Sequence, residues 1–138
     1  MKIIQIAGRS NSGKTTFIKH LIPELKKTGS VAVVKHLADH KFHLDEGKDT
    51  TIFFENGADI SVGIDSQKAV ITTKTNELND ILQNLDDQKI TYAIIEGFKQ
   101  HPYNKIVIGD LIIENCILKN PTIEDVIQSL DRFDNFKK

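Results

Sequence analysis

The chain has 138 residues, of which 39% are hydrophobic and 27% are charged, and its formal net charge is −1. These values are typical of a globular protein with one hydrophobic core, so we expect a single domain over residues 1–138. The balanced charge argues against general nucleic-acid binding, and neither a signal-peptide pattern nor an apolar run of membrane-spanning length is present. We therefore expect a cytoplasmic protein with no nucleic-acid or membrane partner.

An apolar, β-branched run at residues 3–7 predicts a buried strand. Residues 8–15 follow and read Gly-Arg-Ser-Asn-Ser-Gly-Lys-Thr, which fills every fixed position of the pattern G-x-x-x-x-G-K-[ST]. Apolar residues then recur at helical spacing over residues 17–25, which predicts a helix. Pro23 would kink or split it, and we keep the helix and expect a bend. Strand, glycine loop and helix in this order are typical of a phosphate-binding loop, which makes an ordinary flexible turn the weaker interpretation.

In such a loop, main-chain N–H groups and the positive end of the following helix face a bound anion. We expect Lys14 to reach the β and γ phosphates of a nucleoside triphosphate, and the Thr15 hydroxyl to ligate Mg²⁺. The nucleotide-binding residues predicted in this segment are Gly8, Arg9, Ser10, Asn11, Ser12, Gly13, Lys14, Thr15 and Thr16.

The next segment predicts a second strand and a polar loop. Residues 31–34 are apolar enough for a strand buried on both faces, which completes a strand–helix–strand unit. Residues 37–48 have no clear apolar period and predict an irregular loop. A short helix is expected over about residues 49–56, closed by Gly57.

The second half of the chain predicts a hairpin and further alternating elements. Residues 60–64 and 69–72 are strand candidates joined by a polar turn, which suits an antiparallel hairpin. The other expected elements are a helix near residues 78–85, strands at 92–95, 106–108 and 112–118, and a last helix that Thr122 caps. Cys116 is the only cysteine, so no disulfide forms within the chain, and its apolar neighbours predict a buried thiol.

Alternating strands and helices predict the fold class. We expect an α/β protein with the three-layer fold of nucleoside triphosphatases that carry a phosphate-binding loop. Its sheet should be mostly parallel, with an antiparallel hairpin near residues 60–72.

Glu96 ends the buried strand at residues 92–95 and is our candidate for a carboxylate that holds Mg²⁺ opposite Thr15. Proteins with a phosphate-binding loop usually carry aspartate there, so the longer glutamate would act through water or orient the attacking water. The alternative is a solvated acid at a strand end. Lys99 follows after one short turn and could face phosphate or an anionic partner.

Residues 35–45 lie at the end of the second strand, where ligands bind to parallel sheets, and contain three histidines and two aspartates. They could ligate a transition metal or form a polar switch segment with Asp39 on the Mg²⁺ shell and Lys35 or the histidines, His36 among them, near phosphate. We favour the switch, because cysteine ligands are absent and the spacing fits no closed zinc site. The predicted catalytic residues are Lys14, Asp39 and Glu96, and the predicted Mg²⁺ ligands are Thr15, Asp39 and Glu96.

These segments together resemble the molybdopterin-guanine dinucleotide biosynthesis protein B family, GTP-binding accessory proteins of molybdenum cofactor maturation. The similarity rests on the loop at residues 8–16, Val-Lys-His at 34–36 with Asp39 and His40, Asp45 with 46–49, Gly57-Ala58-Asp59, and Ile-Glu-Gly-Phe-Lys at 95–99. It implies GTP with Mg²⁺, weak intrinsic hydrolysis, and homodimerisation partly through extra strands. It also implies partnership with the guanylyltransferase that joins GMP to molybdopterin, with molybdopterin itself as a further candidate ligand.

One departure concerns the base. The guanine-reading pattern N-K-x-D of many GTPases is missing, because residues 104–107 read Asn-Lys-Ile-Val. The guanine preference therefore follows only from the resemblance. Asn120 comes after a late strand, at the end of the sheet where a base would bind, and is our candidate replacement.

No glutamine or arginine in the chain obviously completes a hydrolytic site, so we expect slow turnover, on the order of 10⁻⁴ s⁻¹ as in unassisted GTPases. Arg9 lies five residues before Lys14, where a related class of dimeric proteins carries a lysine that crosses to the partner's phosphates. It is either such a residue or a plain surface arginine.

Two other functions remain as alternatives. A small-molecule kinase would transfer the γ phosphate to a metabolite, although the short chain lacks an arginine-rich lid. A metal-insertion GTPase would use His36, His40 and His43. His20 and His101 are expected to be isolated surface residues.

Overall fold

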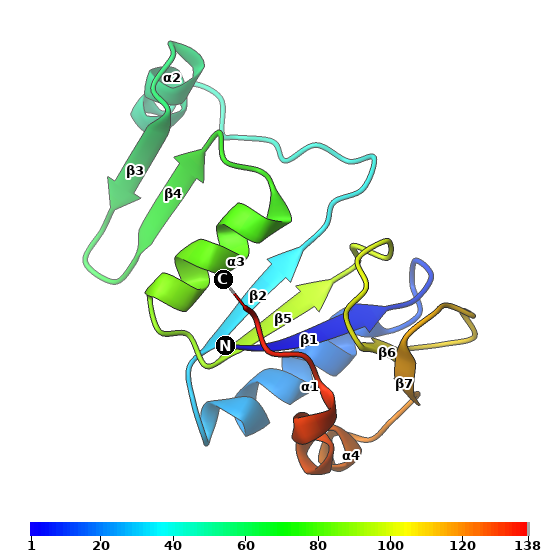
Figure 1. The fold of residues 1–138 in the computed structure, drawn as a ribbon. Coiled ribbons are helices and arrows are strands. Elements are labelled where there is room, and N and C mark those ends of the chain that lie inside the picture. The colour runs from blue at the N-terminus through cyan, green and yellow to red at the C-terminus, as the bar shows by residue number, and fades with distance from the viewer. Residues whose placement is uncertain (138) are drawn as a thin grey trace. The chain divides into compact units, whose positions relative to one another are not determined.

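The computed structural model describes residues 1–137, and the chain divides into two compact units (Figure 1). The first unit comprises Met1–His36 and the chain from Leu82 onward, and the second comprises Leu37–Ile81. The helix α3 (Leu78–Asp87) begins in the second unit and ends in the first. Our expectation of a single domain stays a prediction.

The first unit is built on a five-stranded sheet with the order β2-β5-β1-β6-β7. Every neighbouring pair is parallel. The strands are β1 (Lys2–Ala7), β2 (Val31–Lys35), β5 (Tyr92–Glu96), β6 (Lys105–Val107) and β7 (Cys116–Lys119). Parallel strands end at the same edge, so the last residues of β1, β2 and β5 lie together there.

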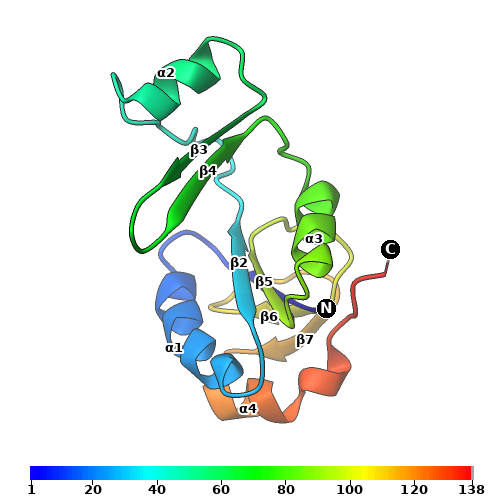
Figure 2. The same ribbon diagram turned by 90° about the vertical axis from the view of Figure 1, so that its left-hand side faces the viewer.

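The hydrophobic core lies between one face of this sheet and the helices α1 (Lys14–Lys26) and α4 (Ile123–Gln128), with a short 3₁₀ helix η1 (Leu130–Arg132) after α4. Figure 2 shows α1 and α4 on the same side of the sheet. Ile4 and Ile6 of β1 pack there with Leu21 and Leu25 of α1, and all four are fully buried. Burial of such side chains is the main stabilising contribution to the fold, about 1.5–3 kcal/mol for each one.

Helix α1 is continuous through Pro23, so the break allowed by the sequence does not occur. Leu21 and Leu25 flank the proline and are buried, which holds this stretch against the sheet. Thr122 caps α4 as expected: its hydroxyl accepts from the Asp125 N–H, and the Asp125 carboxylate accepts from the Thr122 N–H.

The predicted strand at residues 112–118 is wrong in its extent, because β7 begins only at Cys116. Asn115 has a left-handed backbone with a φ of 59°, and Ile112 is 91% exposed. The predicted burial of Cys116 is also wrong, since its thiol is exposed. An edge strand packs on one side only, which an apolar sequence does not reveal.

The second unit contains α2 (Asp49–Glu55) and a two-stranded antiparallel hairpin of β3 (Ile60–Ile64) and β4 (Ala69–Thr73). Both the short helix and the hairpin were predicted. Ser61 is buried on the face toward α2, where its hydroxyl donates to the Thr50 carbonyl over 2.8 Å. The structure thus confirms an α/β protein with a mostly parallel sheet and a small antiparallel pair.

Across residues 1–137, none of the helices combines the length and apolar character needed to cross a membrane.

Candidate functional site

The glycine loop joins the end of β1 to the start of α1, as its pattern requires. A Cβ atom on Gly8 would lie 2.5 Å from the Ile108 carbonyl oxygen and 2.6 Å from Ser12 Oγ, so only glycine fits. Gly13 precedes α1 with a φ of 98°, a conformation that side chains disfavour. Both fixed glycines are therefore explained by the local geometry.

The hydroxyl of Ser12 is buried and has no hydrogen-bond partner among the described residues. A buried polar atom usually has a partner, so an orphan inside a glycine loop is consistent with a bound anion or water. Ser10, Asn11, Thr15 and Thr16 are exposed around the same loop.

Lys14 lies against the main chain of the loop. Its Nζ donates to the Gly8 carbonyl over 3.0 Å and to the Arg9 carbonyl over 2.7 Å. Burial lowers the pKa of Lys14 from 10.5; the nearby Glu96 carboxylate opposes this shift, and the ammonium groups of Lys99 and Lys35 add to it. Charges from two other segments, the end of β2 and the end of β5 with the residues that follow it, therefore act on Lys14. The predicted phosphate site stays a prediction.

Glu96 is the last residue of β5 and is only 8% exposed. It stands in register with Ile6 of β1 and Lys35 of β2, and its carboxylate lies 3.9 Å from the Lys35 ammonium. A buried carboxylate with one distant cation is well suited to a further cation partner. Carboxylate and hydroxyl oxygens suit Mg²⁺, so Glu96 and Thr15 carry donor groups of the right chemistry, and their predicted place in a Mg²⁺ site stays a prediction.

Within the chain described here, no three His, Cys, Asp or Glu side chains gather in a way that would hold a metal by themselves. Asp39 is exposed in the loop of the second unit, next to Ala38 with its φ of 51°. Its predicted place on the Mg²⁺ shell stays a prediction. The same holds for His40 and His43, which belong to that loop.

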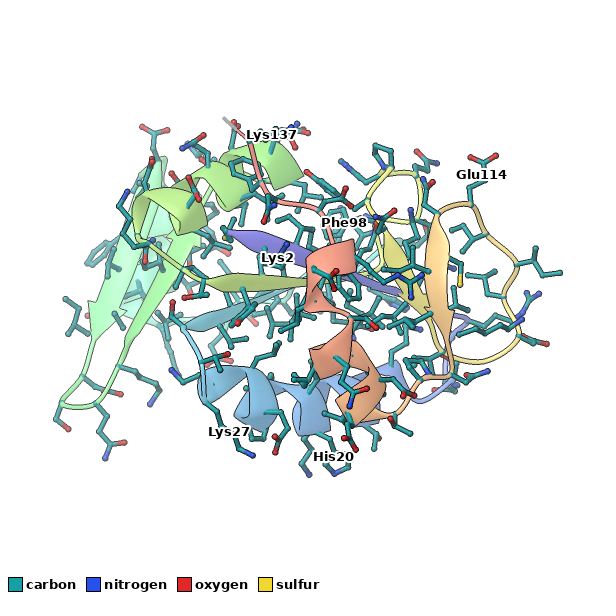
Figure 3. All side chains as sticks on the ribbon, turned by 60° about the horizontal axis from the view of Figure 1, so that its bottom comes forward. Lys2, His20, Lys27, Phe98, Glu114 and Lys137 are labelled. Atoms are coloured by element: carbon teal, nitrogen blue, oxygen red, sulfur yellow. The ribbon has the colours of Figure 1, made fainter. Side chains whose placement is uncertain are left out.

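The segment after β5 carries a row of rings that sequence reasoning missed. His36 and Phe98 are stacked with centroids 4.6 Å apart, His101 meets the edge of Phe98 at 5.8 Å, and Tyr103 follows at 6.2 Å. The expectation that His101 is isolated is therefore wrong, whereas His20 points away from the sheet on the outer side of α1 (Figure 3). The close spacing of Phe98, His101 and Tyr103 was the available signal.

Asn120 binds the loop after β6. Its Oδ1 accepts from the Gly109 N–H over 2.7 Å, and its Nδ2 donates to the Gly109 carbonyl over 3.1 Å. Gly109 approaches the glycine loop, since a Cβ atom on it would lie 3.3 Å from the Cβ of Ser12. The predicted base-reading role of Asn120 stays a prediction, but the structure gives this side chain a place in supporting the loop.

Arg9 forms an ion pair with Asp110, with Nε 3.1 Å from Oδ1, and their side chains are 67% and 86% exposed. This contact again joins the glycine loop to the segment after β6. An exposed pair of this kind contributes about 0–1 kcal/mol, so it leaves the guanidinium available to other anions.

The fold and this site define a class: α/β proteins in which a complete G-x-x-x-x-G-K-[ST] loop joins the central strand of a parallel sheet to the first helix. The sequence model of one family, MobB, described as molybdopterin guanine dinucleotide synthesis protein B, matches residues 3–130. The chain belongs to this family.

Curated relatives agree with the match. The chain is 35% identical over 111 residues to the molybdopterin-guanine dinucleotide biosynthesis adapter protein of Haemophilus influenzae, an alignment that covers 77% of this chain and 62% of that protein. It is 30% identical over 113 residues to the adapter protein of the same name from Escherichia coli, covering 77% and 64%. The alignments span between 42% and 64% of the length of the curated relatives matched.

Solved structures share the fold. The crystal structure of Bacillus subtilis MobB superimposes with a TM-score of 0.72 at 22% identity and covers 99% of this chain and 100% of that chain. A MobB homolog from Bacillus stearothermophilus gives a TM-score of 0.58 at 21% identity, covering 99% and 75%.

Proposed function

We propose that this chain is an adapter in molybdopterin-guanine dinucleotide biosynthesis that binds GTP with Mg²⁺ and hydrolyses it slowly. The observation that carries the proposal is the complete glycine loop with Lys14, beside the buried Glu96 on the neighbouring strand. Family membership supports the pathway, and curated relatives are named as adapter proteins of that biosynthesis.

In this site the loop N–H groups and Lys14 would bind the β and γ phosphates, while Thr15 and Glu96 would hold the metal. When bound, Mg²⁺ would neutralise charge that develops on the phosphates. Glu96, with its longer side chain, would also orient a water. Lys35 and Lys99 would add positive charge near Lys14.

We also propose a homodimer that uses the hairpin of the second unit. Ile60, Val62 and Ile64 alternate along β3 and are 59%, 47% and 79% exposed. Ile71, 64% exposed, pairs with Val62 across the hairpin, so this face is apolar and open. A second copy brings the same surface, and pairing the two would remove apolar area from water at about 25 cal/mol per Å².

The partner that fits an adapter of this family is the guanylyltransferase that joins GMP to molybdopterin, with molybdopterin as a further candidate ligand. Co-purification of the tagged chain with that enzyme tests the assignment. A stable complex supports it, and repeated absence of the enzyme argues against it.

Isothermal titration of GTP and of ATP, each with and without Mg²⁺, tests the nucleotide. We expect GTP to bind more tightly, Mg²⁺ to strengthen binding, and Lys14→Met to abolish it while the circular dichroism spectrum is unchanged. A preference for ATP would favour a small-molecule kinase. Tight stoichiometric Zn²⁺ or Ni²⁺ binding would favour a metal-insertion GTPase that uses His36, His40 and His43.

A further inference from the structure

Two buried polar side chains lie next to each other on the sheet. Gln5 of β1 and Lys105 of β6 are register partners, and they are 0% and 1% exposed. Because side chains alternate along a strand, Gln5 faces away from the core that its neighbours Ile4 and Ile6 form with α1. The interior of a sheet normally carries apolar residues at such positions, so the burial of two polar side chains requires an explanation.

Both side chains bind the loop after β5 from beneath. Gln5 Nε2 donates to the carbonyl oxygens of Gly97 and Phe98, each over 2.7 Å. Lys105 Nζ donates to the carbonyl oxygens of His101 and Tyr103, over 2.6 and 2.9 Å. The segment 97–103, which we call the β5 loop, is therefore held near both of its ends.

Several groups that hold the loop, or belong to it, are in energetically unfavourable states. Burial lowers the pKa of Lys105 from 10.5, which means that its ammonium is destabilised there even though Asp134 and Glu114 oppose the shift. Gln5 Oε1 is buried without a partner among the described residues. Phe98 has a left-handed backbone with a φ of 51°, directly after Gly97 with a φ of 86°. Such strain persists where the surroundings determine the conformation, commonly at functional sites.

The β5 loop carries Lys99, three residues after Glu96 at the end of β5. Lys99 is exposed, and its ammonium has no hydrogen bond or ion pair in the chain described here, so its main chain determines where it lies. It is nonetheless close enough to Lys14 for its charge to act there. Phe98, on the opposite side of the sheet from His20 (Figure 3), stacks on His36 and fixes the loop against the end of β2.

We propose that Gln5 and Lys105 are positioning residues, which hold the β5 loop so that Lys99 faces the phosphates bound at Lys14. The inference rests on the proposed GTP binding and adds residues that neither touch the nucleotide nor belong to the glycine loop. By contrast, Lys35 sits on β2 itself and does not depend on this loop.

A double-mutant cycle on GTP affinity tests the proposal, using Gln5→Met with Lys99→Ala and, as the matched control, Lys35→Ala. Methionine keeps the length of glutamine and removes both donors. We expect Lys99→Ala to weaken GTP binding about fivefold in the wild-type background and less than about twofold in Gln5→Met, because residues coupled through a shared shift of the backbone are not additive in such cycles. Lys35→Ala should cost the same factor in both backgrounds.

Equal effects of Lys99→Ala in the two backgrounds would overturn the proposal, and so would no effect of Lys99→Ala on the wild type. Failure of the wild-type protein to bind GTP would instead overturn the proposed function. Lys105→Met provides the same cycle from the other end of the loop if Gln5→Met does not fold. Hydrogen exchange of the wild-type protein adds an independent check. We expect slow exchange at the amides of Gly97 and His101, which donate to the carbonyl oxygens of Ile6 and Phe98, and exchange there as fast as in an exposed loop would contradict the inference.

Discussion

The carboxamide of Asn120 forms two hydrogen bonds with the main chain of Gly109, one to its N–H and one to its carbonyl oxygen. Gly109 in turn approaches Ser12 of the glycine loop. The sequence suggested that Asn120 contacts the base of the nucleotide, whereas its hydrogen bonds indicate that it supports the glycine loop through Gly109. The two roles make different predictions.

We expect Asn120→Ala to weaken GTP and ATP binding by the same factor, because a looser glycine loop affects phosphate binding whatever the base. The loss of the two bonds should also lower the melting temperature by a few degrees, since one hydrogen bond contributes about 0.5–1.5 kcal/mol. Titration calorimetry and thermal melts measure both. Asn115→Ala is the control, because Asn115 also has a positive φ but does not contact Gly109. A change in the ratio of GTP to ATP affinity would support base reading instead.

Arg9 and Asp110 form an exposed ion pair, so removing it should lower the melting temperature by less than about 2 °C. If Arg9 reaches the phosphates of a partner subunit, Arg9→Ala should slow GTP turnover of the dimer, whereas Asp110→Ala should not. Both variants lose the same pair, and only the first loses the guanidinium. Unchanged GTP turnover in Arg9→Ala would show that Arg9 does not act on the partner's phosphates and only forms its ion pair with Asp110.

The lowered pKa of Lys14 predicts how anion affinity depends on pH. A polyphosphate binds the protonated ammonium, so affinity should fall as the pH rises through this lowered pKa, below the ordinary value of 10.5. Calorimetric titration with tripolyphosphate avoids the ionisation of a base. Lys14→Met should bind weakly and lack this decline, and a wild-type affinity that stays constant up to pH values near 10.5 would contradict the prediction.

A charge on the apolar hairpin face should dissociate the proposed homodimer. Val62→Lys and Ile71→Lys introduce charges at paired, exposed positions, so the second unit should keep its fold while self-association is lost. Sedimentation velocity over a range of concentrations measures this. Gln67→Lys at the turn between the strands is the matched control and should remain dimeric. A wild-type protein that stays monomeric at every concentration would refute the dimer.

Local patterns in the sequence were sufficient for much of the fold. The glycine loop, the hairpin of β3 and β4, and the cap at Thr122 each depend on residues close together in the chain. Their backbone conformations follow from glycine, from alternation of apolar residues and from short-range hydrogen bonds. The sequence also placed Glu96 at the end of a strand and Lys14 at the start of a helix, and a parallel sheet then predicts that the two lie near each other.

Contacts between distant segments escaped prediction. The strand expected over residues 112–118 is shortened because Asn115 adopts a left-handed backbone and Ile112 has no surface to pack against. His101 joins a row of rings because the β5 loop turns back over the sheet. The presence of an apolar or aromatic residue in the sequence does not predict which side chain it contacts in the folded protein.

The sequence by itself determined that this chain has a phosphate-loop pattern between a strand and a helix, and that it resembles one family of accessory proteins. Only the tertiary structure decided that Gln5 and Lys105 stand side by side beneath the β5 loop, and that Asn120 binds Gly109. The physical reason is that a glycine loop is a local conformation, whereas the partner of a buried donor depends on strand order and register. Those are set by burial summed over the whole sheet.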